Sequence, residues 1–248
     1  MTWRVVDDEP RTEAMHHALD DVLTDRLDAG EMPPTLRFWY RQREGVAMGR
    51  FQAYDDEVEA DYVDDRDIEV VRRITGGGAM FVQPGNVITY SMYLPRDRVS
   101  DDVETSYAEL DRWAIDALDD LGLDVTHEPL NDITHPDGKI GGAAQLRREN
   151  AVLHHVTMSY DLDVREMLRV LRIGKVKVSD KAVKSAEKRV AVMTDYLDET
   201  RAEVIGHLTD HFVDTFGGEM GSFTDDELAA AEERAREQFA TDDWNRRL

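Results

Sequence analysis

The pattern of apolar and polar positions predicts helices near both ends of the chain and in its middle. Over residues 12–27 apolar side chains recur every three or four positions, and Thr12 stands where an N-cap residue would. Thr224 precedes three consecutive acidic residues, which is typical of a helix start because acidic side chains favour the positive end of the helix dipole. The further helices are predicted over 106–121, 164–171, 198–215 and 224–239.

Shorter runs rich in β-branched and aromatic residues predict strands. These runs cover residues 35–40, 45–49, 68–74 and 87–94. Residues 139–140 and 151–161 flank a turn at 147–150 and are predicted to form a hairpin, whereas 174–188 is polar, basic and predicted to be a loop. Strands lead and helices end the chain, so the predicted fold class is α+β, with helices on a mixed or antiparallel β-sheet. We expect one domain over residues 1–248.

The absence of cysteine and of long apolar runs excludes several classes of protein. The chain has no cysteine, which excludes disulfides, thiolate metal sites and a cysteine nucleophile within it. Its first residues lack the basic and apolar regions of a signal peptide, and no apolar run approaches the ~20 residues of a membrane helix. We therefore expect a soluble, cytoplasmic protein.

The net charge is strongly negative, and the charged residues are unevenly distributed along the chain. Acidic residues outnumber Lys and Arg by 53 to 30, which gives a net charge of −23. Such a surface repels nucleic acid. We interpret it as halophilic adaptation, because salt screens repulsion between carboxylates; an ordinary acidic enzyme is the alternative. All six lysines fall within residues 139–188, a basic island that indicates a bound anion or, alternatively, a solvated basic surface.

The segment RRITGGGAMF, residues 72–81, is the first candidate for ligand chemistry. Three adjacent glycines lose much conformational entropy on folding, so they usually serve a close approach or a positive φ. Directly after a strand they can present backbone N–H groups to an anion, and Arg72 and Arg73 add forks of donors for phosphate. The segment is neither a P-loop nor GxGxxG, and a plain glycine turn is the alternative.

A lone lysine among small residues marks the second candidate. Lys139, the first lysine of the chain, lies in KIGGAAQ, shortly after Asn131 and Asp132. Small neighbours would let a bulky ligand lie against the backbone while one ammonium points at it. A surface lysine in a glycine turn is the alternative.

The adjacent histidines His154 and His155 are the third candidate. Neighbouring side chains of a strand point to opposite faces of the sheet, so the two cannot easily share a metal ion. Neither HExxH nor cysteine is present to complete a zinc site. We expect one histidine to face a ligand pocket and the other to face the opposite side.

Taken together and in this order, the segments resemble the lipoate–protein ligase branch of the biotin and lipoate ligase superfamily. The family pattern RRx(S/T)GGGAVFHDxGN is matched by RRITGGGAMFVQPGN, its ND and KxxGxA by residues 131–144, and its LHHGTLL by LHHVTMS from Leu153. Residues 49–52 (GRFQ), 184–190 and 243–245 (DWN) match further family elements. The resemblance covers nearly the whole chain; each motif is weak alone, but six in order are strong.

The resemblance implies a catalytic domain like that of biotin ligases and class II aminoacyl-tRNA synthetases. It also implies the reaction: lipoate and ATP with Mg²⁺ form lipoyl-AMP, whose acyl group moves to the ε-amine of a lysine. The implied acceptors are the lipoyl domains of 2-oxoacid dehydrogenase acyltransferase subunits and the glycine-cleavage carrier protein. Neither a nucleic acid nor a membrane is an expected partner. Some short family members rely on a separate accessory protein for adenylation, and we expect this chain to be the catalytic half of such a two-part ligase.

The resemblance also assigns roles to matching residues. Lys139 is the implied catalytic residue, a compact cation that would stabilise charge between the acyl oxygen and the α-phosphate. Asp132 is an implied contact to Mg²⁺ or to the ribose. The residues implied to bind ATP and lipoate are Arg72, Arg73, Gly76, Gly77, Gly78, Ala79, Met80, Phe81, Asn86, Asn131, Asp132, Gly142, Ala144, His155 and Thr157.

Two departures from the family pattern lie near the implied pocket. Val82 and Gln83 replace HD, and Val156 replaces the glycine of HHGT, so lipoate, octanoate or another acid all stay candidates. An octanoyl or lipoyl transferase of the same fold is the nearest alternative, but such enzymes use a cysteine. A biotin ligase would carry a basic GRGRxGR-type loop, which is absent. A non-catalytic lipoate-binding protein is disfavoured by Lys139 and the arginine–glycine segment.

Overall fold

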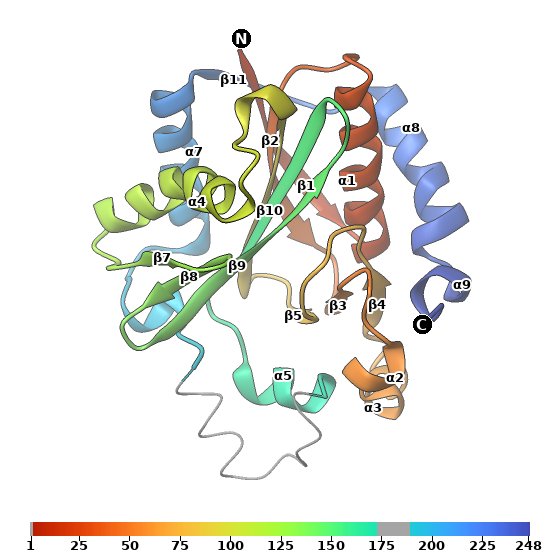
Figure 1. The fold of residues 1–248 in the computed structure, drawn as a ribbon. Coiled ribbons are helices and arrows are strands. Elements are labelled where there is room, and N and C mark those ends of the chain that lie inside the picture. The colour runs from red at the N-terminus through yellow and green to blue at the C-terminus, as the bar shows by residue number, and fades with distance from the viewer. Residues whose placement is uncertain (1, 173–188) are drawn as a thin grey trace.

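The computed structural model describes residues 2–172 and 189–248, and strands of two sheets form its centre (Figure 1). The strands are β1 (Trp3–Arg11), β2 (Thr35–Arg41), β3 (Gly45–Met48), β4 (Glu69–Arg72), β5 (Met80–Val82), β6 (Val87–Pro95), β7 (Thr126–Glu128), β8 (Asp132–His135), β9 (Gly138–Arg147), β10 (Ala151–Ser159) and β11 (Gly218–Gly221). The helices are α1 (Glu13–Asp28), α2 (Tyr54–Glu57), α3 (Ala60–Asp65), α4 (Val103–Asp120), α5 (Val164–Val170), α7 (Arg201–Phe216), α8 (Asp225–Arg234) and α9 (Asp242–Asn245), and a π-helical turn at Ala235–Phe239 follows α8.

The larger sheet has eight strands in the order β11-β1-β2-β6-β10-β9-β8-β7. β1 runs parallel to both of its neighbours, and every pair from β2 to β7 is antiparallel. A second sheet, β4-β3-β5, has one parallel and one antiparallel pair. The predicted fold class, α+β with a mixed sheet, is confirmed.

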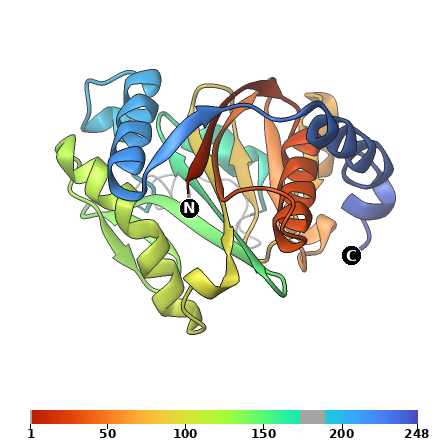
Figure 2. The same cartoon turned by 90° about the horizontal axis from the view of Figure 1, so that it is seen from above.

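Helices cover both faces of the larger sheet. Seen from above, α4 and α7 lie on one side of it and α1 and α8 on the other (Figure 2). The first pair closes the larger apolar core, in which Trp113 of α4 and Phe212 of α7 pack on strand residues such as Phe38 and Tyr90. The second pair closes a smaller core around Leu19, between α1, α8 and the adjoining ends of β6 and β10.

Helix α1 begins where its sequence predicts. The Thr12 hydroxyl accepts a hydrogen bond from the backbone N–H of Met15 at 3.2 Å, which satisfies one of the free donors of the first turn. Because α1 lies between the sheet and α8, most of its polar side chains are buried as well as its apolar ones. Those facing the sheet include Glu13, His16, His17 and Asp20. Buried polar groups need partners, and the sheet supplies most of them.

Most predicted elements are present, with shifts of one to three residues at their ends. The predicted hairpin is longer than expected, because β9 runs over ten residues whose glycines and alanines hide its strand character. The sequence pattern missed β1, in which only Val5 and Val6 are buried. It also missed the short strands β5, β7, β8 and β11 and the short helices α2, α3 and α9. The predicted loop over 174–188 lies outside the described residues.

No helix within residues 2–172 and 189–248 has the length and apolar character needed to cross a membrane.

Candidate active site

One row of residues runs straight across five strands of the larger sheet. Trp39 on β2 pairs with Thr89 on β6, Thr89 with Thr157 on β10, Thr157 with Gly142 on β9, and Gly142 with Asp132 on β8. Neighbouring strands lie about 4.8 Å apart, so this row, which we call the floor, is roughly 19 Å long. It faces α1 and the smaller sheet.

A cavity of about 140 Å³ lies on the floor. The segment between β4 and β5, which carries the three glycines, covers it through Gly77, Gly78 and Ala79, together with Met80 at the start of β5. Gly77 has φ 96°, a conformation that glycine adopts without strain. The predicted glycine-rich segment therefore forms one wall of a cavity instead of a plain surface turn.

Arg73 holds this glycine segment in shape from inside. Its guanidinium donates to the backbone carbonyls of Ala47 at 2.8 Å, Gly76 at 2.7 Å and Gly78 at 2.8 Å, and it lines the cavity. Burial lowers the pKa of Arg73 to about 10, which leaves it charged at neutral pH. Among the described residues it forms no ion pair with a carboxylate, so its positive charge acts on the cavity.

A chain of hydrogen bonds ties the glycine segment to α1. Asp20 accepts from Nδ1 of His155 at 2.8 Å, and Nε2 of His155 lies 2.9 Å from the Thr75 hydroxyl. Burial lowers the pKa of His155, so the ring is neutral, and Asp20 then selects the tautomer with the proton on Nδ1. Thr75 in turn accepts from Nε of Arg73 at 3.0 Å.

The two adjacent histidines point to opposite faces, as predicted. His155 lines the cavity, whereas Nε2 of His154 lies 2.8 Å from Oδ1 of Asp111 on α4, on the other side of the sheet. No cluster of three or more His, Asp or Glu residues suited to a metal ion occurs in the part of the chain that the structure describes.

Lys139 lies at the open end of the floor. Its Nζ donates to Oδ1 of Asp132 at 2.7 Å, and both side chains are partly exposed, at 43% and 36%. Asn131 donates to the carbonyl of Ala143, which holds the segment before β8 against β9. The ammonium thus has one anionic partner and faces a space that solvent and ligands can reach.

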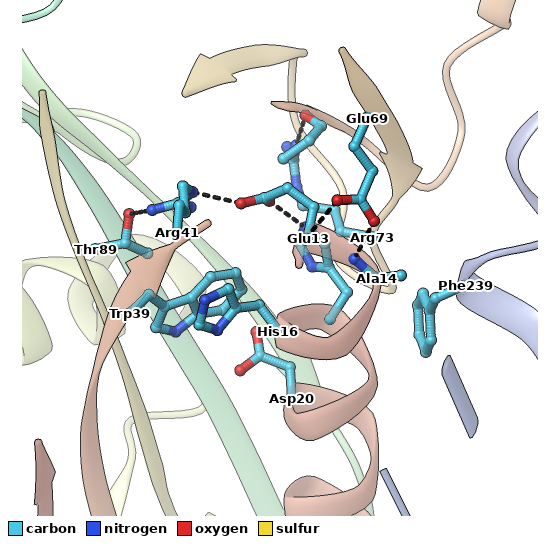
Figure 3. Close-up of polar contacts among 12 residues, drawn as sticks. Glu13, Ala14, His16, Asp20, Trp39, Arg41, Glu69, Arg73, Thr89 and Phe239 are labelled. Atoms are coloured by element: carbon cyan, nitrogen blue, oxygen red, sulfur yellow. Dashed lines mark hydrogen bonds and ion pairs between the residues drawn. The ribbon is translucent and has the colours of Figure 1, made fainter. Parts of the chain in front are cut away.

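The other end of the floor is closed and carries a buried ion pair. Arg41 donates through Nε to Glu13 and through Nη1 to Thr89 at 2.9 Å (Figure 3). The Thr89 hydroxyl lies 3.0 Å from that of Thr157. Burial acts to raise the pKa of the Glu13 carboxyl, but the charge of Arg41 holds it well below its usual value. Arg41 also lines the cavity.

The structure brings most of the predicted site residues together. Those that line the cavity are Arg73, Gly77, Gly78, Ala79, Met80, Asn131, Lys139, Gly142, Ala144, His155 and Thr157. Asp132 contacts Lys139, and the Gly76 carbonyl contacts Arg73.

Three predicted residues lie away from the cavity. The buried Arg72 donates to backbone carbonyls of the 49–52 segment and of Trp244 and Asn245. Phe81 belongs to the core beneath the smaller sheet. The carbonyl of Asn86 accepts from the backbone N–H groups of residues 160 and 161.

Sequence reasoning missed six residues that line the cavity: His17, Trp39, Arg41, Ala47, Thr89 and Ala143. The sequence carried a signal for two of them, Trp39 and Arg41. Together with Arg37 they lie at alternate positions of a strand that is otherwise apolar, so the three side chains share one face. Charged side chains on a buried face need polar partners. His17 carried no comparable signal, because it sits in a helix with mixed polar residues on all sides.

Comparison with known proteins places this arrangement in a family. A profile described as "Lipoyl protein ligase A/B catalytic domain" matches residues 13–213. Lipoate-protein ligase A subunit 1 of Thermoplasma acidophilum is 31% identical over 248 residues, which covers 95% of this chain and 93% of that protein. Octanoyltransferase LipM of Brevibacillus brevis is 26% identical over 274 residues, which covers 99% of each.

Solved structures agree with these matches. A bi-partite lipoate protein ligase from Thermoplasma acidophilum, studied with its E2 lipoyl domain, superimposes with a TM-score of 0.89 at 29% identity, covering 99% of this chain and 96% of that one. A lipoate protein ligase from the same organism with bound lipoic acid gives 0.84 at 26% identity, covering 100% of each chain. A lipoate-protein ligase A bound with ATP gives 0.84 at 28% identity, covering 99% of each.

Proposed function

The chain belongs to the family of lipoyl protein ligase A/B catalytic domains, and on that premise we propose that it activates lipoate with ATP and transfers the lipoyl group to a lysine of a carrier domain. The family and the enzyme class inferred from the sequence motifs are thereby confirmed. Similar proteins are named both as ligases and as octanoyltransferases, so the reaction itself is the proposal.

The observation that carries the proposal is that the floor is open at one end and closed at the other. Lys139 is 43% exposed at the open end, whereas Trp39 is 1% exposed at the closed end. A carboxyl group that must meet ATP and later an amine has to lie at the open end. The acyl tail of the acid then lies along the floor toward Trp39.

In the first step a carboxylate oxygen of lipoate attacks the α-phosphorus of ATP. The bond between that phosphorus and the bridging oxygen to the β-phosphate breaks, pyrophosphate leaves with the electron pair, and lipoyl-AMP forms. Negative charge grows on the α-phosphate, and Lys139 is the cation placed to stabilise it. Arg73 adds a second positive charge that no carboxylate among the described residues neutralises.

In the second step the ε-amine of a carrier lysine attacks the acyl carbon. The bond from that carbon to the AMP oxygen breaks, AMP leaves with the electron pair, and the nitrogen releases its extra proton to solvent at the open end. The amine must arrive uncharged, so a nearby ammonium favours the free base of the incoming lysine.

Mg²⁺ fits the site only as an ion shared with the nucleotide. Asp132 is the one predicted metal contact, and it forms an ion pair with Lys139. Mg²⁺ bound through one or two carboxylates and the phosphates of its substrate is the usual arrangement. Asp132 would hold the ion, which neutralises phosphate charge when bound.

A carrier domain and a second protein are the proposed partners. A similar structure is that of a bi-partite ligase studied with its E2 lipoyl domain. That likeness supports a lipoyl domain as the acceptor and an accessory protein as part of the active enzyme.

The test is pyrophosphate release by the purified chain with ATP and Mg²⁺, with lipoate, octanoate or biotin as the acid, with and without an apo-lipoyl domain. We expect release that depends on lipoate and, with the carrier present, a mass increase of one lipoyl group. If no acid supports release in the presence of a carrier and of an accessory subunit, the proposed reaction is wrong.

Octanoyl transfer without ATP is the second candidate, favoured by the match to octanoyltransferase LipM over nearly the full length of both chains. The 248 residues contain no cysteine, so a thioester-linked acyl-enzyme cannot form on them. Transfer from octanoyl carrier protein to a lipoyl domain without ATP would establish this candidate instead.

A further inference from the structure

We propose that the ring of His17 selects a sulfur-bearing acyl tail over a straight alkyl tail, which makes His17 a specificity-determining residue. The inference rests on the proposed function, because it assumes that the acid lies along the floor with its tail at the closed end. It assigns to His17 the choice between lipoate and octanoate.

His17 lies at the closed end of the cavity. Its side chain is 2% exposed and lines the cavity together with Trp39, whose ring lies 5.2 Å away at an interplanar angle of 76°. On the α8 side the ring of Phe239 is 6.3 Å from that of His17. The tail of a bound acid would therefore end against two aromatic rings, with a third behind them.

Polar contacts account for only one edge of the His17 ring. Nε2 contacts Oε2 of the buried Glu13 at 3.4 Å, and Nδ1 has no hydrogen-bond partner among the residues that the structure describes. Glu13 is already paired with Arg41, so the contact to Nε2 alone does not require a histidine at this position, and the unpaired Nδ1 destabilises the fold. The neighbouring His16, by contrast, is bonded to the Tyr40 carbonyl at 2.6 Å.

The ring presents carbon atoms to the cavity. Both nitrogens are buried against protein atoms, yet the residue lines the cavity, so the surface that meets a ligand is the aromatic carbon surface. Sulfur is polarisable and is attracted to aromatic rings, whereas a methylene group gains less from the same contact. The dithiolane sulfurs of lipoate would contact His17 and Trp39, and the end of an octanoyl chain would not match that contact.

A pair of substitutions separates the ring from its nitrogens. His17→Phe keeps an aromatic ring and removes both nitrogens, and His17→Leu removes the ring. The probes are lipoate and octanoate, each titrated calorimetrically into the purified chain without ATP, and the quantity compared is the Kd for octanoate divided by the Kd for lipoate. His211→Leu on α7, on the opposite side of the sheet, is the matched control for loss of a histidine.

In the wild-type chain and in His211→Leu we expect lipoate to bind about tenfold tighter than octanoate. His17→Leu should lower the ratio three- to tenfold, which lies within the roughly two- to twelvefold range of one sulfur–aromatic contact, and His17→Phe should leave it within about twofold. If His17→Leu does not fold, as judged by its melting transition, His17→Gln removes the ring while keeping a polar side chain and should lower the ratio likewise.

Two results would overturn the assignment: a ratio in the ring-less variants equal to that of the wild type, or an equal loss in His17→Phe. A wild-type chain that binds neither acid would refute the proposed function and the assignment together. That outcome is distinguishable from the others, because in them the wild type still binds lipoate.

Discussion

A methyl group on Gly142 would lie 2.9 Å from Nζ and 3.1 Å from Cε of Lys139, three residues earlier on the same strand. Gly142 therefore leaves the space in which the lysine side chain lies over the floor. In Gly142→Ala the flexible lysine must move, while the strand keeps its pairing. We expect acid-dependent pyrophosphate exchange to fall at least about tenfold, with the melting temperature nearly unchanged.

The control for a glycine-to-alanine change is Gly206→Ala on α7, where the added methyl group meets nothing within 4 Å. That variant should be as active as the wild type and, because alanine is the better helix former, slightly more stable. Full exchange activity in Gly142→Ala would show that the position of Lys139 over Gly142 is unimportant.

Removing the ammonium itself should have a larger effect. Lys139→Ala should lose at least about 2–3 kcal/mol of transition-state stabilisation, the scale for one preorganised electrostatic group, which is a fall of roughly 30- to 150-fold in rate. Acid-dependent exchange between pyrophosphate and ATP measures it. Because the side chain is partly exposed, the variant should fold normally, and wild-type exchange by a folded Lys139→Ala would remove Lys139 from the mechanism.

Acid should destabilise the protein from just below neutral pH. Burial lowers the pKa of His155, and lowers that of His16 well below its usual value. Both rings are protonated more readily in the unfolded chain, so stability is full above a pH of about 6.5 and is lost as the pH falls below it, by up to ~1.4 kcal/mol per pH unit for each histidine. Denaturant unfolding between pH 8 and 5.5 at fixed molar salt measures this loss.

A variant without His155 is the control for this dependence of the free energy of unfolding on pH. In His155→Gln one of the two histidines is gone, so the free energy of unfolding should depend less steeply on pH, although the loss of the bonds to Asp20 and Thr75 lowers its value throughout. A wild-type stability that does not change between pH 7.5 and 5.5 would mean that these rings are not held neutral.

Helices α1 and α8 were predictable because apolar periodicity and the N-caps Thr12 and Thr224 are local properties of the sequence. The lone Lys139 and the glycine segment were equally visible, since both are unusual in composition. The floor was not, because it depends on the register of five strands, and register is set by pairing between distant segments. Trp39 and Thr89 are 50 positions apart in sequence and meet only through that pairing.

The structure also explains why the sequence did not predict the buried ion pairs. Arg37 and Asp20 are fully buried and bonded to each other at 2.8 Å, while Arg41 pairs with Glu13. Each partner comes from a different element, so nothing local predicts which charged residue of α1 meets which charged residue of β2. A buried charge is tolerated only with such a partner.

Stability should depend on salt. Outside residues 139–190 the chain carries 47 acidic and 18 basic residues. Ions screen repulsion between these carboxylates, with a Debye length of about 3 Å at 1 M and 30 Å at 0.01 M. We expect the melting temperature to fall on going from molar to millimolar KCl, and more than it does for a protein near neutrality. A melting temperature that is flat or rises over this range would refute the halophilic interpretation.

The exposure of Lys139 leads to a last prediction, on the need for a second protein. Lys139 and Asp132 are 43% and 36% exposed at the open end of the floor, where water weakens the attraction between the ammonium and a phosphate. If the proposed accessory protein covers this end, it excludes water and strengthens that attraction during adenylation. Aminolysis of a preformed adenylate depends less on the exclusion of water, because its leaving group, AMP, is already attached to the acyl carbon. The purified chain should therefore lipoylate a carrier from lipoyl-AMP at least about tenfold faster than from lipoate and ATP, and an accessory subunit should close the gap. Similar, substantial rates from both donors without any added protein would mean that the chain is a self-sufficient ligase.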